Sequence, residues 1–338
     1  MDNKKGFEIQ FNWIFVLIVG AIIIIFFTTI IVRQKGISET SNKAAVLKGM
    51  ESIIAGSSVS ISTTGIIDTP DSEVGIGCNN VAVGTVSKQY QNLILFAPSL
   101  IKGTKLIWQT LPFNVPFRTT NILYMTSPKV RYWLIGDDSD MLFNEINDSL
   151  PKELDKKKLK LGMLLSITNS NNYKVKLVFV NTPLQPNTVP DSLKGMPDAD
   201  VTAVKISGDE KKGTIEFYEK TGNSWTNKGT SSYFGTNHVL GAVYAGQFET
   251  YDCNTQHIFS RTSIVAKIYL ERTNMLKNVP SLKLSCVNSY AMAISSLGII
   301  SLASPNAVSN YVAALNSNYQ QLKNENKKLE ENSCPLIY

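Results

Sequence analysis

Twenty consecutive residues without a charge, from Trp13 to Val32, constrain this chain more than any other feature of its sequence. A helix rises about 1.5 Å per residue, so a helix of this length matches the roughly 30 Å hydrocarbon core of a bilayer. A helix also satisfies its own backbone polar groups, as lipid requires. The sequence therefore predicts a transmembrane helix over residues 11–32, preceded by a short tail over residues 1–10.

The apolar stretch is typical of a retained anchor rather than of a cleaved signal. The apolar region of a secretory signal spans about 7–15 residues and ends in a small-residue cleavage site. Here the run is longer, and Arg33 and Lys35 follow it. The indole of Trp13 suits the headgroup region. The predicted partner is the lipid bilayer, and the anchor residues are Trp13, Gly20, Phe27 and Val32.

The cysteines, rather than the charges that flank the anchor, indicate on which side of the membrane the rest of the chain lies. Basic residues stand on both sides of the anchor, and large domains translocate largely regardless of charge. The cysteines are even in number, widely spaced and without a Cys-x-x-Cys pair, which favours disulfides over zinc. We therefore expect an extracytoplasmic carboxyl-terminal body, with buried free thiols in a cytoplasmic body as the alternative. The disulfide candidates are Cys78, Cys253, Cys286 and Cys334.

Beyond the anchor, the residue pattern changes from helical to strand-like and back. Residues 33–57 carry apolar side chains at helical spacing and predict a membrane-proximal helix, with a bend expected at Gly36. Residues 58–256 contain β-branched and aromatic runs cut by Gly, Pro and Asp, and residues 238–246 are one such run. Residues 257–338 predict a C-terminal helical section. The predicted fold class is α+β, with a mixed sheet of about six or more strands.

Two segments of the C-terminal section are expected to pack inside the protein. Residues 290–303 are too few and too rich in serine to cross a membrane, which predicts a core helix. The last helix, opening at Ser304 and Pro305, has an apolar seam with Asn326 at an interior position. Such a seam could support self-association or contact with other envelope proteins, but so short a seam more often packs on its own domain. The seam residues seven apart are Val308, Leu315, Leu322 and Leu329.

Three carboxylates are candidates for a metal site. Asp137, Asp138 and Asp140 follow the predicted strand 131–136, and open α/β sheets bind ligands at the carboxyl ends of their strands. Their oxygens could hold Ca²⁺ or Mg²⁺. The favoured alternative is that they cap a helix beginning near Ser139, because acidic groups stabilise helix N-termini.

Motifs for catalysis are absent. Cys253 and His257 lie four apart and could form a zinc site with Cys286 and Cys334, but the spacing fits poorly, and a disulfide between two of the three cysteines is the stronger prediction. No hydrolase, Walker, dinucleotide or zincin motif occurs, so no catalytic residue and no cofactor is assigned. The densest basic run, Lys152–Lys160, lacks interleaved aromatics, so no nucleic acid partner is expected.

The chain opens with KKGFE at residues 4–8, followed by Phe11, Trp13 and the isoleucine-rich anchor. This segment resembles the amino terminus of a family of uncharacterised single-pass membrane-anchored proteins from small-genome archaea of the DPANN kind. The LPFNVPF segment at residues 111–117 and the terminal SCPLIY are also similar to that family, so the resemblance covers most of the chain. It implies an anchored protein and no particular activity.

Lys4, Lys5 and Gly6 stand directly before Phe7. This order is similar, though more weakly, to that of type IV pilin precursors, in which basic residues and a glycine precede the phenylalanine that becomes the new amino terminus. The resemblance implies a processing site between Gly6 and Phe7. The glutamate of that family is the fifth mature residue, whereas Glu8 would be the second here. The order of apolar helix, amphipathic helix and β-rich head is also similar to pilins and implies a filament subunit.

Together these features predict a membrane-anchored extracytoplasmic protein of the cell envelope with a structural, adhesion or assembly role and no enzymatic activity. One alternative is a pilin-like filament subunit. The other is an envelope-bound enzyme or ligand-binding module that uses the carboxylates.

Overall fold

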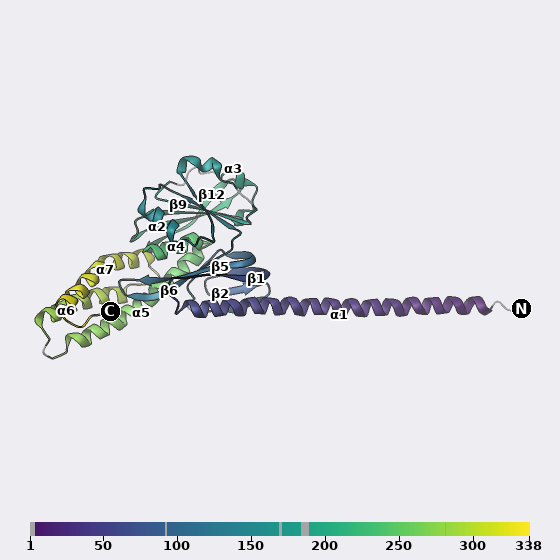
Figure 1. Cartoon of the computed structure of the whole chain (residues 1–338), viewed down its shortest axis with the longest axis horizontal. Coiled ribbons are helices and arrows are strands. Elements are labelled where there is room, and N and C mark those ends of the chain that lie inside the picture. Colours follow the sequence, from purple (N-terminus) through teal and green to yellow (C-terminus); the bar gives the residue numbers. More distant parts are fainter. Residues whose placement is uncertain (1–3, 92, 169–170, 184–188, 281) are drawn as a thin grey trace.

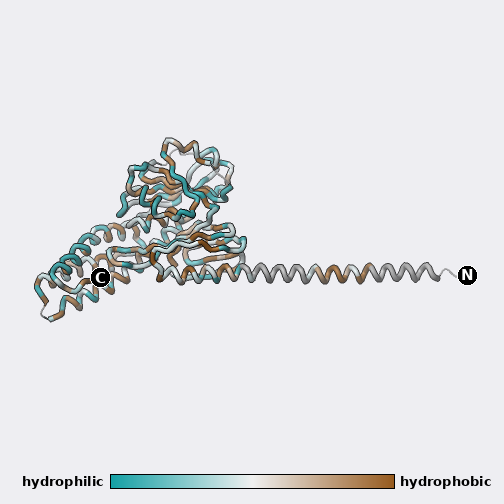
Figure 2. The backbone as a smooth tube through the Cα atoms, in the orientation of Figure 1, coloured by the Kyte–Doolittle hydropathy of each residue, from teal (hydrophilic) through white to brown (hydrophobic). Residues whose placement is uncertain are grey.

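The amino-terminal helix α1 (Lys4–Ser57) projects from the body as a long straight shaft (Figure 1). The computed structural model describes residues 4–91, 93–168, 171–183, 189–280 and 282–338, and in α1 it leaves out the side chains of residues 4–16, 30–40 and 42. The helix continues through Gly36, so the expected bend is not there. The described side chains of its apolar stretch are those of Leu17–Thr29, which are exposed and brown in Figure 2. This described part alone is shorter than a full membrane span.

Only the end of α1 packs against the body. Val46, Leu47, Met50 and Ile53 recur at helical spacing and are buried. They contact a six-stranded sheet, sheet A, whose strand order is β3-β2-β1-β5-β6-β4. All neighbouring pairs in it are antiparallel except β4 and β6. Its strands are β1 (Thr63–Ile76), β2 (Asn80–Val83), β3 (Val86–Gln89), β4 (Leu95–Phe96), β5 (Leu100–Asn114) and β6 (Arg118–Thr126).

A second six-stranded sheet, sheet B, has the order β12-β11-β10-β9-β7-β8. The four neighbouring strands β8, β7, β9 and β10 are parallel to one another, and β11 and β12 extend the sheet as an antiparallel hairpin beside β10. Its strands are β7 (Val130–Ile135), β8 (Asp155–Leu159), β9 (Lys174–Val180), β10 (Val201–Gly208), β11 (Lys212–Thr221) and β12 (Ser224–Phe234). Its connections contain α2 (Met141–Ser149), η1 (Leu161–Ser166), α3 (Asp191–Lys194) and η2 (Asp198–Asp200). The single mixed sheet expected from the sequence is thus replaced by two.

Four helices complete the chain. They are α4 (Thr236–Tyr244), α5 (Phe248–Lys277), α6 (Leu284–Leu302) and α7 (Val308–Glu331). The strand prediction for residues 238–246 was wrong, because α4 covers most of that run. An apolar run buried on every side gives no periodicity that separates strand from helix. Gly241 fits this buried site, since a Cβ there would lie 2.7 Å from the ring of Phe96.

Sheet A lies between two apolar cores. Along β6, Leu123 and Met125 face the core shared with α1, whereas Ile122 and Tyr124 face the large core shared with sheet B and helices α2 and α4–α7. This alternation follows from the two-residue period of a strand. A third core lies on sheet B, where Trp133 and Phe179 pack beside Leu193 of α3. The α+β class predicted from the sequence is confirmed.

The C-terminal helices pack on one another and on the body. The seam of α7 is buried, and Asn326 bonds to the chain end, where its Oδ1 accepts from the amide of Ile337. The seam is therefore occupied within the chain, as the self-packing prediction requires. The helix begins at Val308, a little after the predicted cap at Ser304 and Pro305.

Helix α6 lies within the predicted C-terminal helical section and begins before residue 290. Among the described residues it is the one helix long and apolar enough, by length and composition alone, to cross a membrane. The prediction concerned residues 290–303 alone, whereas α6 also includes residues 284–289. One face of α6, including Tyr290, Ala293 and Leu297, is nevertheless buried against α5 and α7, which suits a core helix.

Candidate functional site

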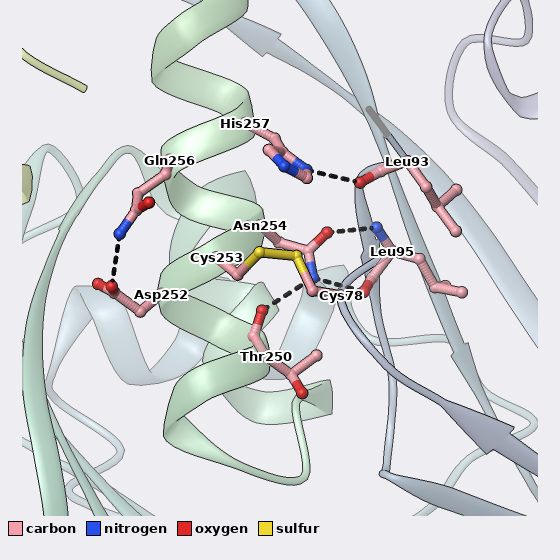
Figure 3. Close-up of a disulfide and its surroundings, with 9 residues drawn as sticks. All are labelled: Cys78, Leu93, Leu95, Thr250, Asp252, Cys253, Asn254, Gln256 and His257. Atoms are coloured by element: carbon pink, nitrogen blue, oxygen red, sulfur yellow. Dashed lines mark hydrogen bonds between the residues drawn. A yellow bond between two sulfur atoms is a disulfide. The ribbon is translucent and has the colours of Figure 1, made fainter. Parts of the chain in front are cut away.

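A disulfide between Cys78 and Cys253 joins the β1–β2 turn to helix α5 and is the centre of the candidate site (Figure 3). The two cysteines are 175 residues apart in the sequence. His257 lies one helical turn after Cys253, so its ring is on the same side of α5 as the sulfur. The fold therefore brings two sulfur atoms and an imidazole together from two distant segments.

The neighbouring residue Asn254 fixes α5 to the first residue of β4, Leu95. Its Oδ1 accepts from the amide of Leu95 at 3.0 Å, and its Nδ2 donates to the carbonyls of Leu95 at 3.1 Å and Thr250 at 2.8 Å. The side chain is buried, so these bonds lack competition from water. One turn later, Nδ1 of His257 and the carbonyl of Leu93 are 3.1 Å apart. Both contacts place α5 independently of the disulfide.

Three potential metal ligands meet at this point. One ligand atom each from Cys78, Cys253 and His257 lies within 4.8 Å of the others, and all three residues are half-buried. Within the part of the chain that the structure describes, no other such group of His, Cys, Asp or Glu occurs. In the disulfide the sulfurs are not thiolates, and the thiolate is the form that binds metal.

A cavity of about 290 Å³ opens beside His257. It is lined by Asn79, Gln89, Tyr90, Gln91 and His257. Burial raises the pKa of Tyr90, whose hydroxyl is buried and has no hydrogen-bond partner among the described residues. The cavity therefore combines an imidazole with side-chain amides, which could orient a small polar ligand.

The zinc set considered from the sequence does not come together. Cys286 of α6 pairs with Cys334, beyond the end of α7, in the second disulfide. The cysteine that does lie beside Cys253 and His257 is Cys78, which spacing along the sequence could not identify. All four cysteines are in disulfides, as predicted, and the pairing left open is Cys78–Cys253 with Cys286–Cys334.

The carboxylates after β7 have other partners. Asp140 caps α2: its Oδ1 accepts from the amide of Phe143 at 2.9 Å, and its Oδ2 accepts from Asn181 at 2.7 Å. Two hydrogen bonds from Ser139 hold the pKa of Asp137 below its usual range. Asp138 lies 3.9 Å from the ammonium of Lys158. The metal alternative is not supported by this geometry, whereas the capping alternative holds for Asp140.

Two buried titratable residues were not identified from the sequence. His238 of α4 is enclosed by aromatic rings, and burial lowers its pKa to about 3. Lys176 of β9 is also buried, and its ammonium donates to the carbonyls of Ala242 and Ala245 at the end of α4. Burial lowers the pKa of Lys176 well below its usual value. Both side chains bond to the surrounding protein, which indicates a structural role.

The residues assigned to the anchor and to processing are described only in part. Gly20 and Phe27 lie within the exposed apolar part of α1. The backbone at Trp13, Val32, Gly6 and Phe7 is helical, but their side chains lie outside the described set. The geometry that carries chemistry is therefore the cluster of Cys78, Cys253 and His257 rather than the helix.

Neither protein-family models, nor curated proteins, nor solved structures show a match to this chain.

Proposed function

We propose that the chain is a single-pass membrane-anchored protein of the cell envelope, with an extracytoplasmic body and a structural, adhesion or assembly role rather than an enzymatic one. The observation that carries this proposal is the apolar part of α1 that no other element covers. Ile24 is 65% exposed and Phe27 57% exposed. Single exposed apolar residues are ordinary on protein surfaces, but a continuous apolar helix surface is a membrane or protein interaction site.

The proposed span covers residues 11–32, where the sequence has no charge after Glu8 until Arg33. Helix α6 is the weaker candidate for an anchor, since one of its faces packs against α5 and α7 and Cys286 ties it to the chain end. Two disulfides support an extracytoplasmic body, because such bonds persist in oxidising compartments. Membership of the archaeal family that the amino terminus resembles remains part of the same proposal.

Membrane attachment and sidedness are tested together in intact cells. A membrane-impermeant maleimide should label the full chain only after a membrane-impermeant reductant has opened its disulfides, because all four cysteines are paired. The chain should stay in the membrane fraction at alkaline pH, and a variant with Ile23→Lys and Ile24→Lys should be released from it. A matched variant, Lys43→Ala and Lys48→Ala, should remain bound. Labelling without reductant, or release of the unaltered chain, would contradict the proposal.

A filament subunit is the second candidate function. The observation that favours it is the continuity of α1, whose last part packs on the mainly antiparallel sheet A while the rest extends away from the body (Figure 1). Parallel packing of such helices from many copies would bury the exposed apolar stretch without lipid.

This second candidate predicts a processed amino terminus. Protein isolated from native membranes should begin at Phe7 if a prepilin-type peptidase cuts after Gly6, and a Gly6→Leu variant should keep its original start. The measurement is amino-terminal sequencing by mass spectrometry. A native chain that begins at Met1 or Asp2 would exclude the filament function but leave the anchored function intact.

A further inference from the structure

We propose that reduction of the Cys78–Cys253 disulfide converts the cluster with His257 into a Cys₂His site for Zn²⁺, with its fourth coordination position open to the adjacent cavity. This inference goes beyond the structural role proposed above. It requires that the three side chains stay together when the disulfide opens, that their distances suit the metal, and that His257 presents a free lone pair.

Contacts other than the disulfide hold both sides of the cluster in place. On α5, the buried side chain of Asn254 bonds to both backbone groups of Leu95. On the other side, the β1–β2 turn is closed by the amide of Gly77, which donates to the carbonyl of Asn80 at 2.9 Å. The amide of Tyr90 donates to the carbonyl of Asn79 at 2.8 Å and adds a second tie. The thiols of Cys78 and Cys253 should therefore remain neighbours after reduction.

The ligand atoms are near enough to reach the spacing of a tetrahedral zinc site once the bond between the sulfurs is broken. Bonds of about 2.3 Å to sulfur and about 2.0 Å to nitrogen place neighbouring ligand atoms roughly 3.5–3.8 Å apart. The ligand atoms of Cys78, Cys253 and His257 lie within 4.8 Å of one another. Once the disulfide is broken, rotation of the two side chains can separate the sulfurs, whose Cα atoms lie 6.0 Å apart.

His257 has the second partner that a zinc-binding histidine usually has. A carbonyl oxygen can only accept, so Nδ1 of His257 carries the proton and donates it to Leu93. In the neutral imidazole, Nε2 then has the lone pair that a metal requires. Histidine ligands in zinc sites almost always donate their other ring N–H to a carbonyl, a carboxylate or water, which fixes the ring.

Three protein ligands leave one position of the tetrahedron free. The cavity of about 290 Å³ next to His257 has room for a water molecule or a small ligand in that position. Sites with three protein ligands and one open position are the kind in which zinc activates a bound molecule, whereas structural sites have four protein ligands.

The interconversion balances with a dithiol as reductant. The dithiol gives two electrons and two protons to the disulfide and becomes a disulfide itself, while Cys78 and Cys253 become thiols. Binding of Zn²⁺ then releases both thiol protons, so that two thiolates and the neutral imidazole hold the ion. In the reverse direction, the disulfide form of that dithiol accepts two electrons from the two thiolates by thiol–disulfide exchange, so that Zn²⁺ is released and the bond between Cys78 and Cys253 forms again. The local redox balance would thus decide which form is present.

The test is a Co²⁺ titration of the full chain in detergent micelles, reduced with a phosphine that competes little for metal. We expect one Co²⁺ per chain, with tetrahedral visible bands and a thiolate charge-transfer band, and its displacement by Zn²⁺. Cys78→Ser should abolish the charge-transfer band, and His257→Asn should weaken binding at least tenfold. Native mass spectrometry with Zn²⁺ gives the stoichiometry independently, and far-UV circular dichroism of the metal-bound chain reports its helix content.

Two controls make the result specific. Gln256 is on the same helix but bonds to Asp252, away from the cluster, so Gln256→Ala should bind as the unaltered chain does (Figure 3). Cys286→Ser with Cys334→Ser removes the other pair of thiols and should also leave binding unchanged. The proposal is overturned if the reduced chain binds no Co²⁺ through thiolate or if Cys78→Ser binds as well as the unaltered chain. It is equally overturned if the metal-bound chain lacks the native helix content.

Discussion

Replacing Cys78 and Cys253 together by serine is expected to lower the free energy of unfolding by about 5 kcal/mol. The disulfide closes a loop with a sequence separation of 175 residues, and a cross-link restricts the unfolded chain more as its loop lengthens. Chemical denaturation of the full chain in detergent, with a metal chelator present, measures the difference. Serine keeps the size and polarity of the site, so the loss reports mainly the cross-link.

The second disulfide provides the matched comparison. Cys286 and Cys334 are 48 residues apart, and the same chain-entropy model gives about 4 kcal/mol for their replacement by serine. The long loop should therefore contribute more than the short one. Equal losses, or a larger loss for the short loop, would mean that native-state contacts of the sulfurs rather than chain entropy decide the stability.

A loss of stability on mild acidification is expected from His238. Its Nδ1 accepts from the amide of Phe234, and its Nε2 bonds to Thr255 Oγ1, so the folded protein holds the ring neutral. Burial lowers its pKa to about 3, whereas the ordinary value is near 6.5. As the pH falls below about 6.5, the unfolded chain takes up a proton that the folded chain does not, so stability falls with pH. The loss between pH 7 and pH 5 amounts to about 2 kcal/mol.

The measurement compares unfolding free energies at pH 7 and pH 5 for the full chain and for His238→Phe. Phenylalanine cannot form hydrogen bonds with Phe234 or Thr255, so this variant should be less stable at pH 7. Its free energy of unfolding should nevertheless lack the dependence on pH that His238 contributes. The control is Thr262→Val, which alters a buried polar residue of α5 that does not titrate. This substitution should lower the free energy of unfolding by the same amount at both pH values. A slope that persists in His238→Phe would refute the assignment.

Periodicity predicted those parts of the fold in which one face alone is buried. The buried residues of α1 from Val46 to Ile53 and the seam of α7 follow helical spacing, and both helices occur where the sequence places them. Periodicity failed for residues 238–246, where α4 is buried all round. It also could not divide the strands between two sheets, because that division depends on pairings between distant segments such as β4 with β6.

The candidate site was only partly accessible from the sequence, for a similar reason. The even number and wide spacing of the cysteines predicted disulfides, and the capping role of Asp140 follows from its place before an amphipathic helix. The proximity of Cys78 to His257 arises only when sheet A docks on α5. A polar residue such as Lys176 gives no local signal of burial, since its place in an alternating strand fits a solvent-facing side chain equally well.

The position of sheet A between two cores limits how the protein can be shortened. Val74, Leu95 and Met125 are covered by the end of α1, so a chain that starts after Ser57 would present this apolar sheet surface to water. Such a product would precipitate rather than yield a soluble domain. Expression of the body without its lipid-facing part should therefore begin upstream of Lys43, which keeps the packed turns of the helix and removes the uncovered ones.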